Sequence, residues 1–141
     1  LHGVLAPFDL IKPYRLEMGT KLKTNNGKNL YDFWGDKITN SLNDTIKKNN
    51  SRYLINLASN EYSKSIKLKN IKAKIIDVKF LDKKKDKYKI ISFFSKKARG
   101  SMASFIMKNK VKSVSVLKTF SGLGYEFYPS ESNEQSLVFI R

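Results

Sequence analysis

Three groups of polar residues in this sequence combine types and spacings that could carry chemistry. In the first group, Asp9 is followed by Arg15 and Glu17 in otherwise apolar surroundings. In a pocket, the arginine would hold a phosphate or a carboxylate, and the glutamate would act as an acid, a base or a hydrogen-bond acceptor. The same charges would equally form a buried ion-pair network that only fixes the fold. Of these two interpretations we favour the buried network.

The second group follows a short apolar stretch and comprises Asn56, Ser59, Glu61 and Tyr62. Side chains at the end of a strand are well placed to meet a ligand, and asparagine and glutamate can read base edges. Turn formation and helix capping would explain the asparagine and the serine equally well. Combined with the first group, these residues define the alternative catalytic set of a nucleobase- or nucleoside-processing enzyme: Arg15, Glu17, Asn56 and Glu61.

The third group is a cluster of cations at the start of an expected helix, which Ser95 would cap. The first-turn amides could converge on a phosphate with Lys96, Lys97 and Arg99, and Gly100 would let a backbone approach closely. Residues 96 to 112 hold six cations and no acid, and residues 64 to 74 form a second acid-free lysine run. The two runs could line a groove. We assign nucleic-acid binding to Arg15, Lys64, Lys67, Lys96, Lys97, Arg99 and Lys108.

The net charge points to the same class of partner. The 28 lysines and arginines outnumber the 12 aspartates and glutamates, which gives a formal charge of +16 and a pI near 10. Such a surface attracts phosphate backbones through counterion release, whatever their sequence. Two plainer explanations stay open. Lysine and asparagine abound while arginine is scarce, as nucleotide bias in a genome would produce, and charge can serve solubility alone. We favour DNA as the partner.

The residue types that are missing limit the chemistry. Cysteine is absent and His2 is the only histidine, so the chain by itself offers no thiol nucleophile, catalytic triad or histidine-rich metal site. No glycine-rich phosphate loop is present, and we expect neither a cofactor nor a metal. We find no apolar run near the ~20 residues of a membrane span and no signal peptide, so we expect a cytoplasmic protein without a membrane partner. A binding protein is favoured, and enzyme activity stays open.

The elements that position these groups follow from the spacing of apolar residues. Helical spacing from Leu30 to Ile46 follows Asn29 as a cap, and alternation from Ile76 to Phe80 indicates one arm of a hairpin. In chain order we expect a turn at 25–28, a helix at 30–48, a buried strand at 53–57, a helical piece at 58–62, a hairpin of 76–80 and 88–94 around a charged turn at 83–86, a helix at 96–110, and a closing hairpin of 124–128 and 136–140.

These elements predict an α+β fold in which a mixed, largely antiparallel sheet packs against helices, because regular βαβ alternation is absent. The pattern also allows the sheet to curl like a barrel. The chain starts at Leu1 inside an apolar run with no cap or turn before it, so we expect a fragment of a larger fold. Its apolar helix and sheet faces would then need the remaining half for cover.

Four motifs stand in an order and spacing that can be matched to a known family. They are Gly3-Val4-Leu5 with Pro7, Asp9 and Pro13-Tyr14-Arg15-Leu16-Glu17-Met18-Gly19; Leu30-Tyr31-Asp32-Phe33-Trp34-Gly35-Asp36 with Ile38-Thr39-Asn40; Ile55-Asn56-Leu57-Ala58-Ser59 with Glu61-Tyr62; and Ile90-Ile91-Ser92-Phe93 with Lys96-Lys97-Ala98-Arg99-Gly100. With these motifs, nearly the whole chain resembles the C-terminal half of the peroxide stress protein YaaA family.

The resemblance implies that residues 1–141 are the C-terminal portion of a single YaaA-like domain, in a larger mixed α/β fold peculiar to that family. It implies a bacterial, cytoplasmic protein of the oxidative stress response that limits iron-mediated DNA damage. It also implies binding of double-stranded and branched DNA through a basic cleft, into which Arg15, Lys97 and Arg99 are carried by position. A helix-hairpin-helix element is expected in the N-terminal half of the family fold, which makes that half a required partner.

Overall fold

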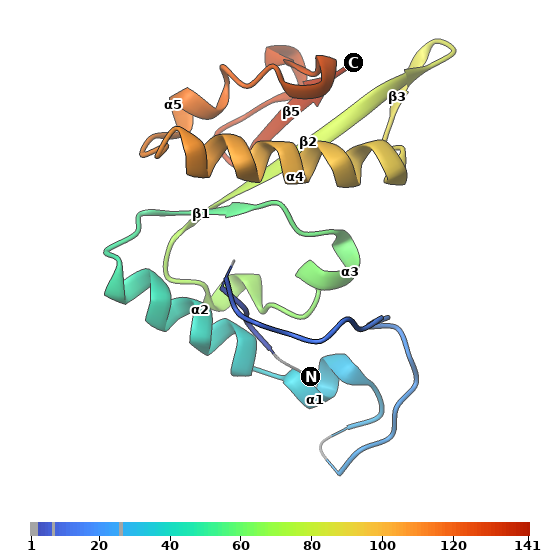
Figure 1. Ribbon diagram of the computed structural model, residues 1–141, viewed down its shortest axis with the longest axis vertical. Helices are drawn as coiled ribbons and strands as arrows, with labels where there is room; N and C mark the ends of the chain where they lie inside the picture. Colours follow the sequence, from blue (N-terminus) through green and yellow to red (C-terminus); the bar gives the residue numbers. More distant parts are fainter. Residues whose placement is uncertain (1–2, 7, 26) are drawn as a thin grey trace. The chain divides into compact units, whose positions relative to one another are not determined.

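The computed structural model describes residues 3–6, 8–25 and 27–141 (Figure 1). The chain divides into two compact units: unit 1 is Leu1–Leu54 with Ala58–Lys74, and unit 2 is Ile55–Leu57 with Ile75–Arg141. The expected origin of residues 1–141 in one larger domain stays a prediction. The helices and strands are α1 (Leu30–Trp34), α2 (Lys37–Lys48), β1 (Tyr53–Asn56), α3 (Asn60–Ser63), β2 (Lys74–Lys84), β3 (Lys87–Lys89), α4 (Ser92–Lys108), α5 (Val114–Leu117), β4 (Glu126–Phe127) and β5 (Ser136–Ile140).

Unit 1 contains the expected N-terminal helix, but in two pieces. Asn29 caps α1 as predicted, because its side-chain oxygen accepts a hydrogen bond from the Asp32 amide at 2.9 Å. Gly35 then adopts φ 48° and ψ −116° and ends α1. Residues with a side chain avoid this conformation, so a glycine sets the break between α1 and α2. The expected end of the helix is confirmed, since α2 stops before Asn49 and Asn50 takes a φ of 48°.

The turn expected at residues 25–28 is closed by its own backbone. Thr24 and Gly27 exchange hydrogen bonds of 2.8 and 3.2 Å. Gly27 has a φ of +154°, and a Cβ built on it would lie 2.1 Å from the Cβ of Asp32, so no larger residue fits. Asn26, which was part of this prediction, lies outside the described residues, and so does His2.

Unit 2 is built on the sheet, whose strands lie in the order β1-β2-β5-β4, with β3 paired to β2. The α+β class is confirmed, and the sheet is mixed. The β2–β3 and β4–β5 hairpins are antiparallel, as expected, whereas β2 and β5 run parallel. Within the described residues the sheet is open at β1 and β4, so the barrel-like curl that the sequence allowed does not occur. The strand at Tyr53 is also confirmed, although its residues are only partly buried.

The core of unit 2 lies between the sheet and α4, which runs along one face of it (Figure 1). Phe80 of β2 stands at its centre, with Phe139 of β5 stacked on it at 5.4 Å and Phe120 and Tyr125 at its edges at 6.0 and 5.1 Å. From α4, Ala98 and Met102 are fully buried against this cluster. Aromatic rings in edge and offset contact contribute beyond their buried area, so this cluster anchors α4.

The start of α4 differs from the sequence prediction. The helix begins at Ser92, whereas residues up to Phe94 were expected in a strand and Ser95 was expected as the cap. Ser95 instead lies inside the helix and is 8 % exposed, on the same buried stripe as Ala98 and Met102. Ser95, Ala98 and Met102 are three and four residues apart, which is the spacing of one helix face. The core-facing side of α4 therefore extends back to Ser95, and the turn that contains Ser95 is helical. β3 is correspondingly short and ends at Lys89.

Candidate nucleic-acid interface

The outward face of α4 gathers three of the cations selected from the sequence. Lys96, Lys97 and Lys108 are exposed on the side opposite the buried stripe, as the turn of about 100° per residue requires. Gly100 and Ser104 lie between them on the same face and are also exposed. The face therefore offers separated positive charges with small residues in between, which leaves room for a backbone to approach. We call these five residues the α4 face.

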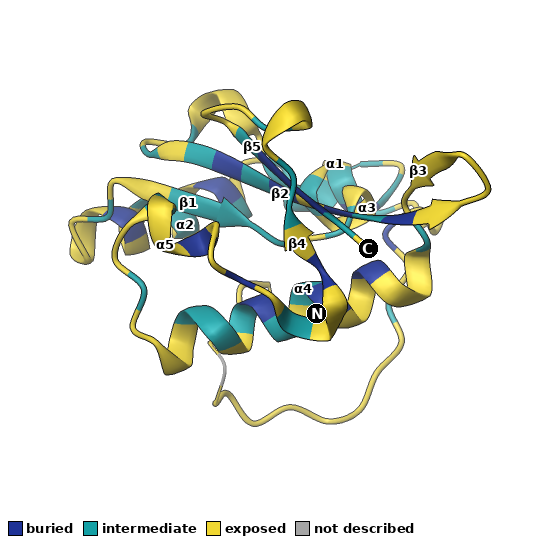
Figure 2. Cartoon of the chain, turned by 90° about the horizontal axis from the view of Figure 1, so that it is seen from above, coloured by how far each residue is buried: buried dark blue, intermediate teal, exposed yellow. Residues whose placement is uncertain are grey.

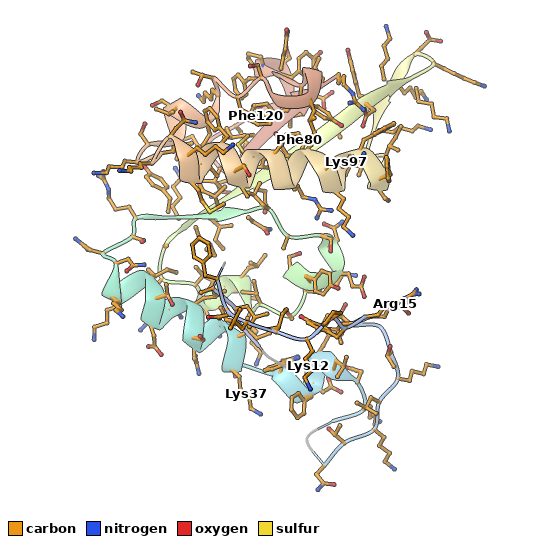
Figure 3. All side chains as sticks on the ribbon, viewed as in Figure 1. Lys12, Arg15, Lys37, Phe80, Lys97 and Phe120 are labelled. Carbon is orange, nitrogen blue, oxygen red and sulfur yellow. The ribbon has the colours of Figure 1, made fainter. Side chains whose placement is uncertain are left out.

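The lysines of the α4 face carry uncompensated charge. No carboxylate within the described residues forms an ion pair with Lys96, Lys97 or Lys108. Lys97, labelled in Figure 3, is a residue of α4. Its Nζ lies 4.5 Å from the centre of the Phe93 ring. Arg99 is half-buried, and its Nε donates a hydrogen bond to the Ser95 carbonyl at 3.2 Å. Of the four α4 cations that the sequence analysis assigned to nucleic-acid binding, Arg99 is therefore the least available to contact a phosphate.

The helix start contradicts the expected contribution of first-turn amides to an anion site at Ser95, whereas anion binding by Lys96, Lys97 and Arg99 stays a prediction. Because α4 begins at Ser92, the amide of Ser95 is already bonded to the Ile91 carbonyl at 2.9 Å. Lys96, Lys97 and Arg99 thus lie in the second turn, away from the free amides of the first. Any phosphate bound by the α4 face is held by side chains alone.

An open hollow of about 350 Å³ lies beside the second half of α4, within unit 2. Polar atoms for a phosphate are available there from Ser101, Ser104, Lys108 and Ser121. Gly122 forms part of its wall, and a Cβ built there would lie 2.5 Å from the Phe120 ring and 2.7 Å from the Ser101 hydroxyl. Close packing around Gly122 explains why this position holds a glycine. The sequence analysis assigned no role to it.

The three cations selected in unit 1 have a different setting. Arg15 donates to Glu17 at 2.6 Å, and the two side chains are 89 % and 59 % exposed. Lys67 pairs with Asp36 at 2.9 Å, whereas Lys64 is exposed. Two of these three cations are therefore partly neutralised by acids. They belong to unit 1 and the α4 cations to unit 2, so the groove expected between the two lysine runs stays a prediction.

The buried ion-pair network expected around Arg15 is wrong. Arg15 and Glu17 form an exposed pair, and Asp9 instead accepts a hydrogen bond from the Ala6 amide at 2.7 Å. Surface pairs of this kind stabilise a fold by about 1 kcal/mol or less. This pair therefore neither fixes the fold strongly nor sits in an apolar pocket.

Unit 1 brings three members of the alternative catalytic set to one segment, because Arg15 pairs with Glu17 and the Glu61 side chain reaches the next residue, Met18. The Glu61 carboxylate accepts a hydrogen bond from the Met18 amide at 2.7 Å, and the Asn56 side chain donates to Asp77 at 2.7 Å within unit 2. Unit 1 does contain a cavity of about 280 Å³. Its lining is largely apolar and aromatic, with Tyr14, Trp34 and Tyr62 among its residues, and it includes no member of the set: Arg15, Glu17, Asn56 and Glu61.

Sequence reasoning missed a buried polar cluster in unit 2. Asp82, 5 % exposed, accepts hydrogen bonds from the Tyr125 hydroxyl at 2.8 Å and from Arg141 Nε at 2.9 Å. The guanidinium carbon of Arg141 lies over the ring of Phe94, 4.5 Å from its centre, and over the ring of Tyr125, 4.8 Å from its centre. Burial, followed by the hydrogen bond to Asp82 and its charge, raises the pKa of Tyr125 to about 12, against the opposing charge of Arg141. The sequence does contain a signal for this cluster. Asp82 occupies a position at which the alternation of buried residues along β2 predicts a buried side chain.

Two structural features are absent from the described residues, 3–6, 8–25 and 27–141. No group of three or more His, Cys, Asp or Glu side chains lies close enough there to hold a metal ion. Nor does that part of the chain contain a helix of the length and apolar character needed to cross a bilayer.

The sequence is similar to a protein family and to several curated proteins. Residues 1–131 match the family described as peroxide stress protein YaaA. A UPF0246 protein of Aliivibrio fischeri is 55 % identical over all 141 residues, which cover 54 % of that protein. UPF0246 proteins of Idiomarina loihiensis and Saccharophagus degradans are each 54 % identical over the same 141 residues, which cover 55 % of them. The chain thus spans about half the length of the curated relatives it matches.

Proposed function

The chain belongs to the peroxide stress protein YaaA family, and we propose that it is a DNA-binding part of the peroxide stress response. Its ligand is the phosphate backbone of double-stranded or branched DNA, and its main contact surface is the α4 face. The cellular effect is to limit iron-mediated damage to that DNA, and the site of action is the bacterial cytoplasm.

The observation that carries this proposal is the uncompensated charge of the α4 face. Its three lysines are exposed and lack acidic partners within the described residues, whereas Arg15 and Lys67 are each paired with an acid. Phosphate contacts from lysines give affinity without sequence preference, and they need no enclosed pocket. The hollow beside α4 adds hydroxyl groups, which are common phosphate donors.

The other half of the family fold is proposed as a partner within the same protein. The relatives are about twice as long as this chain, and unit 1 leaves Phe8 95 % and Leu10 100 % exposed. Burying such side chains stabilises a fold by about 2 kcal/mol each, so a covering surface is favoured. We place the second wall of the DNA cleft on that half.

The enzymatic alternative has less support. A nucleobase-processing site needs its polar side chains in one pocket, but Arg15 and Glu17 form an exposed pair and Glu61 is bonded to the Met18 amide. Turnover of a nucleobase or nucleoside that is lost on Glu17→Gln, while DNA affinity is kept, would restore this alternative.

The test is fluorescence anisotropy of the 141-residue chain with labelled duplex and branched DNA. Changing Lys96, Lys97 and Lys108 to glutamate should weaken duplex binding by at least about 100-fold, if each lost phosphate contact is worth about 1 kcal/mol or more. The matched control changes Lys21, Lys23 and Lys28 to glutamate. These lysines are also exposed, lie in an irregular segment of unit 1, and produce the same change in net charge.

The control variant distinguishes binding at the α4 face from attraction by the net charge of the whole chain. If both triple variants lose affinity equally, net charge alone attracts DNA and the α4 face is not an interface. If neither the wild-type chain nor a family-length relative binds any DNA, the proposed function is wrong.

A further inference from the structure

The β2–β3 hairpin carries a second cationic surface, which sequence reasoning treated only as a charged turn. In this hairpin Lys84 faces Lys87 and Asp82 faces Lys89 across the strands. Directly paired residues point to the same side of a sheet, and alternate residues of one strand do so as well. The lysines at 84, 87 and 89 therefore share the side of buried Asp82 and Phe80, on which α4 packs.

These hairpin lysines repel one another, and Asp86, the acid in the turn between Lys84 and Lys87, forms an ion pair with none of them. Like charges directly opposite each other destabilise a two-stranded ribbon, and Lys84 and Lys87 form such a pair. The nearby Asp82 is already bonded to Tyr125 and Arg141, and no carboxylate in the described part of the chain pairs with the three lysines. All three are exposed on the hairpin (Figure 2). An external anion would remove this repulsion.

An exposed aromatic ring follows the same lysines in the chain. β3 leads from the hairpin tip to the start of α4, where Phe93 follows Lys89 by four residues and is 62 % exposed (Figure 1). The Phe93 ring meets Phe94 edge-on at 5.5 Å and has the Lys97 ammonium 4.5 Å from its centre. Most of its surface is open to solvent, next to the Lys97 ammonium and four residues along the chain from Lys89. Lysines that track phosphates beside a ring that stacks a base are the arrangement of single-strand binding surfaces.

We propose that Lys84, Lys87, Lys89, Phe93 and Lys97, which we call the hairpin–helix surface, bind unpaired DNA. The lysines contact successive phosphates, and one base stacks on Phe93. This inference rests on the proposed DNA binding, since it concerns the same partner. It adds a preference that the α4 face cannot supply, because bases are exposed for stacking only where the duplex is open.

The experiment compares the full 141-residue chain with its Phe93→Ala variant on labelled oligothymidylate and on duplex DNA. Base stacking on an aromatic ring is worth about 1 to 3 kcal/mol, so the variant should bind the single strand about 5- to 150-fold more weakly. Duplex affinity should stay within about two-fold. The Phe93→Tyr variant keeps a stacking ring and should restore single-strand binding.

A second measurement detects stacking directly. Tryptophan at the ring position should be quenched by oligothymidylate in the Phe93→Trp variant, beyond any change of Trp34 seen in the wild type. Changing Lys84, Lys87 and Lys89 to glutamate should abolish that quenching, while the Lys21, Lys23 and Lys28 control should keep it.

The outcomes separate this inference from the proposed function. Duplex binding with no effect of Phe93→Ala on the single strand, or with an equal loss on both ligands, overturns the stacking surface alone. Equal competition by polyglutamate and oligothymidylate at matched charge also overturns it, because an acidic peptide would then suffice. Absence of binding to every DNA overturns the proposed function itself.

Discussion

Tyr125 holds its phenolic proton in an environment that opposes ionisation. Its ring is fully buried, its hydroxyl donates to Asp82, and its pKa is raised from 10.0 to about 12. The folded state therefore keeps a proton that the unfolded chain loses above pH 10. The resulting stabilisation is complete below pH 10 and is lost as the pH rises toward 12, and a shift of this size corresponds to about 2 to 3 kcal/mol.

The measurement is urea unfolding of the wild type and of Tyr125→Phe at several values between pH 9 and pH 12. Both proteins share all lysines and the other tyrosines, so the difference between their free energies of unfolding isolates this residue. We expect that difference to shrink with rising pH. A constant difference would mean that Tyr125 titrates in the folded protein as it does in water.

The same cluster shows what a single sequence can reveal about residues. Val78, Phe80 and Asp82 alternate on β2, so an acid on the buried face could have been noticed. Its partners could not have been, because Tyr125 and Arg141 lie 43 and 59 residues further along the chain. Local patterns specify which side of a strand is buried, but not which distant residue completes a polar cluster.

Two glycines in helical segments predict opposite effects of the same substitution. Gly35 ends α1 with φ 48° and ψ −116°, so Gly35→Ala should destabilise the protein by about 1 to 3 kcal/mol. Gly100 lies within α4, and a Cβ built on it meets nothing within 4 Å. Gly100→Ala should therefore stabilise it by about 0.5 to 1 kcal/mol. Urea unfolding of the two variants tests both signs, and equal signs would contradict the backbone argument.

Elements were predictable where a local signal fixed them and were wrong where two signals competed. The Asn29 cap, the hairpin of β2 and the closing hairpin of β4 and β5 each had a local pattern, and they are present. The start of α4 failed because Tyr88 to Phe94 are good strand formers, while burial of Ser95 with Ala98 imposed a helix. The parallel pairing of β2 with β5 has no local signature at all.

At the scale of the whole molecule, a net charge of +16 does not show which cations form the proposed interface. Charge predicted a polyanionic partner from the sequence alone, but it could not rank the cations. Ion pairs in the structure rank the cations. Acids neutralise Arg15 and Lys67, whereas the lysines of the α4 face have no acidic partner within the described residues. Long-range attraction also fades beyond about 8 Å at physiological salt, so contact residues and distant lysines should separate experimentally.

The salt dependence of duplex binding makes that separation quantitative. Each phosphate contact contributes about −0.9 to the slope of log Kobs against log salt, because it releases a condensed counterion. Changing Lys96, Lys97 and Lys108 to glutamine removes three such contacts and should make the slope shallower by about 3. The same change at Lys21, Lys23 and Lys28 removes the same net charge but, if these lysines do not touch DNA, should alter the slope by less than about 1. Equal changes in the two variants would mean that the duplex contacts a diffuse basic surface, and the α4 face would lose its special role.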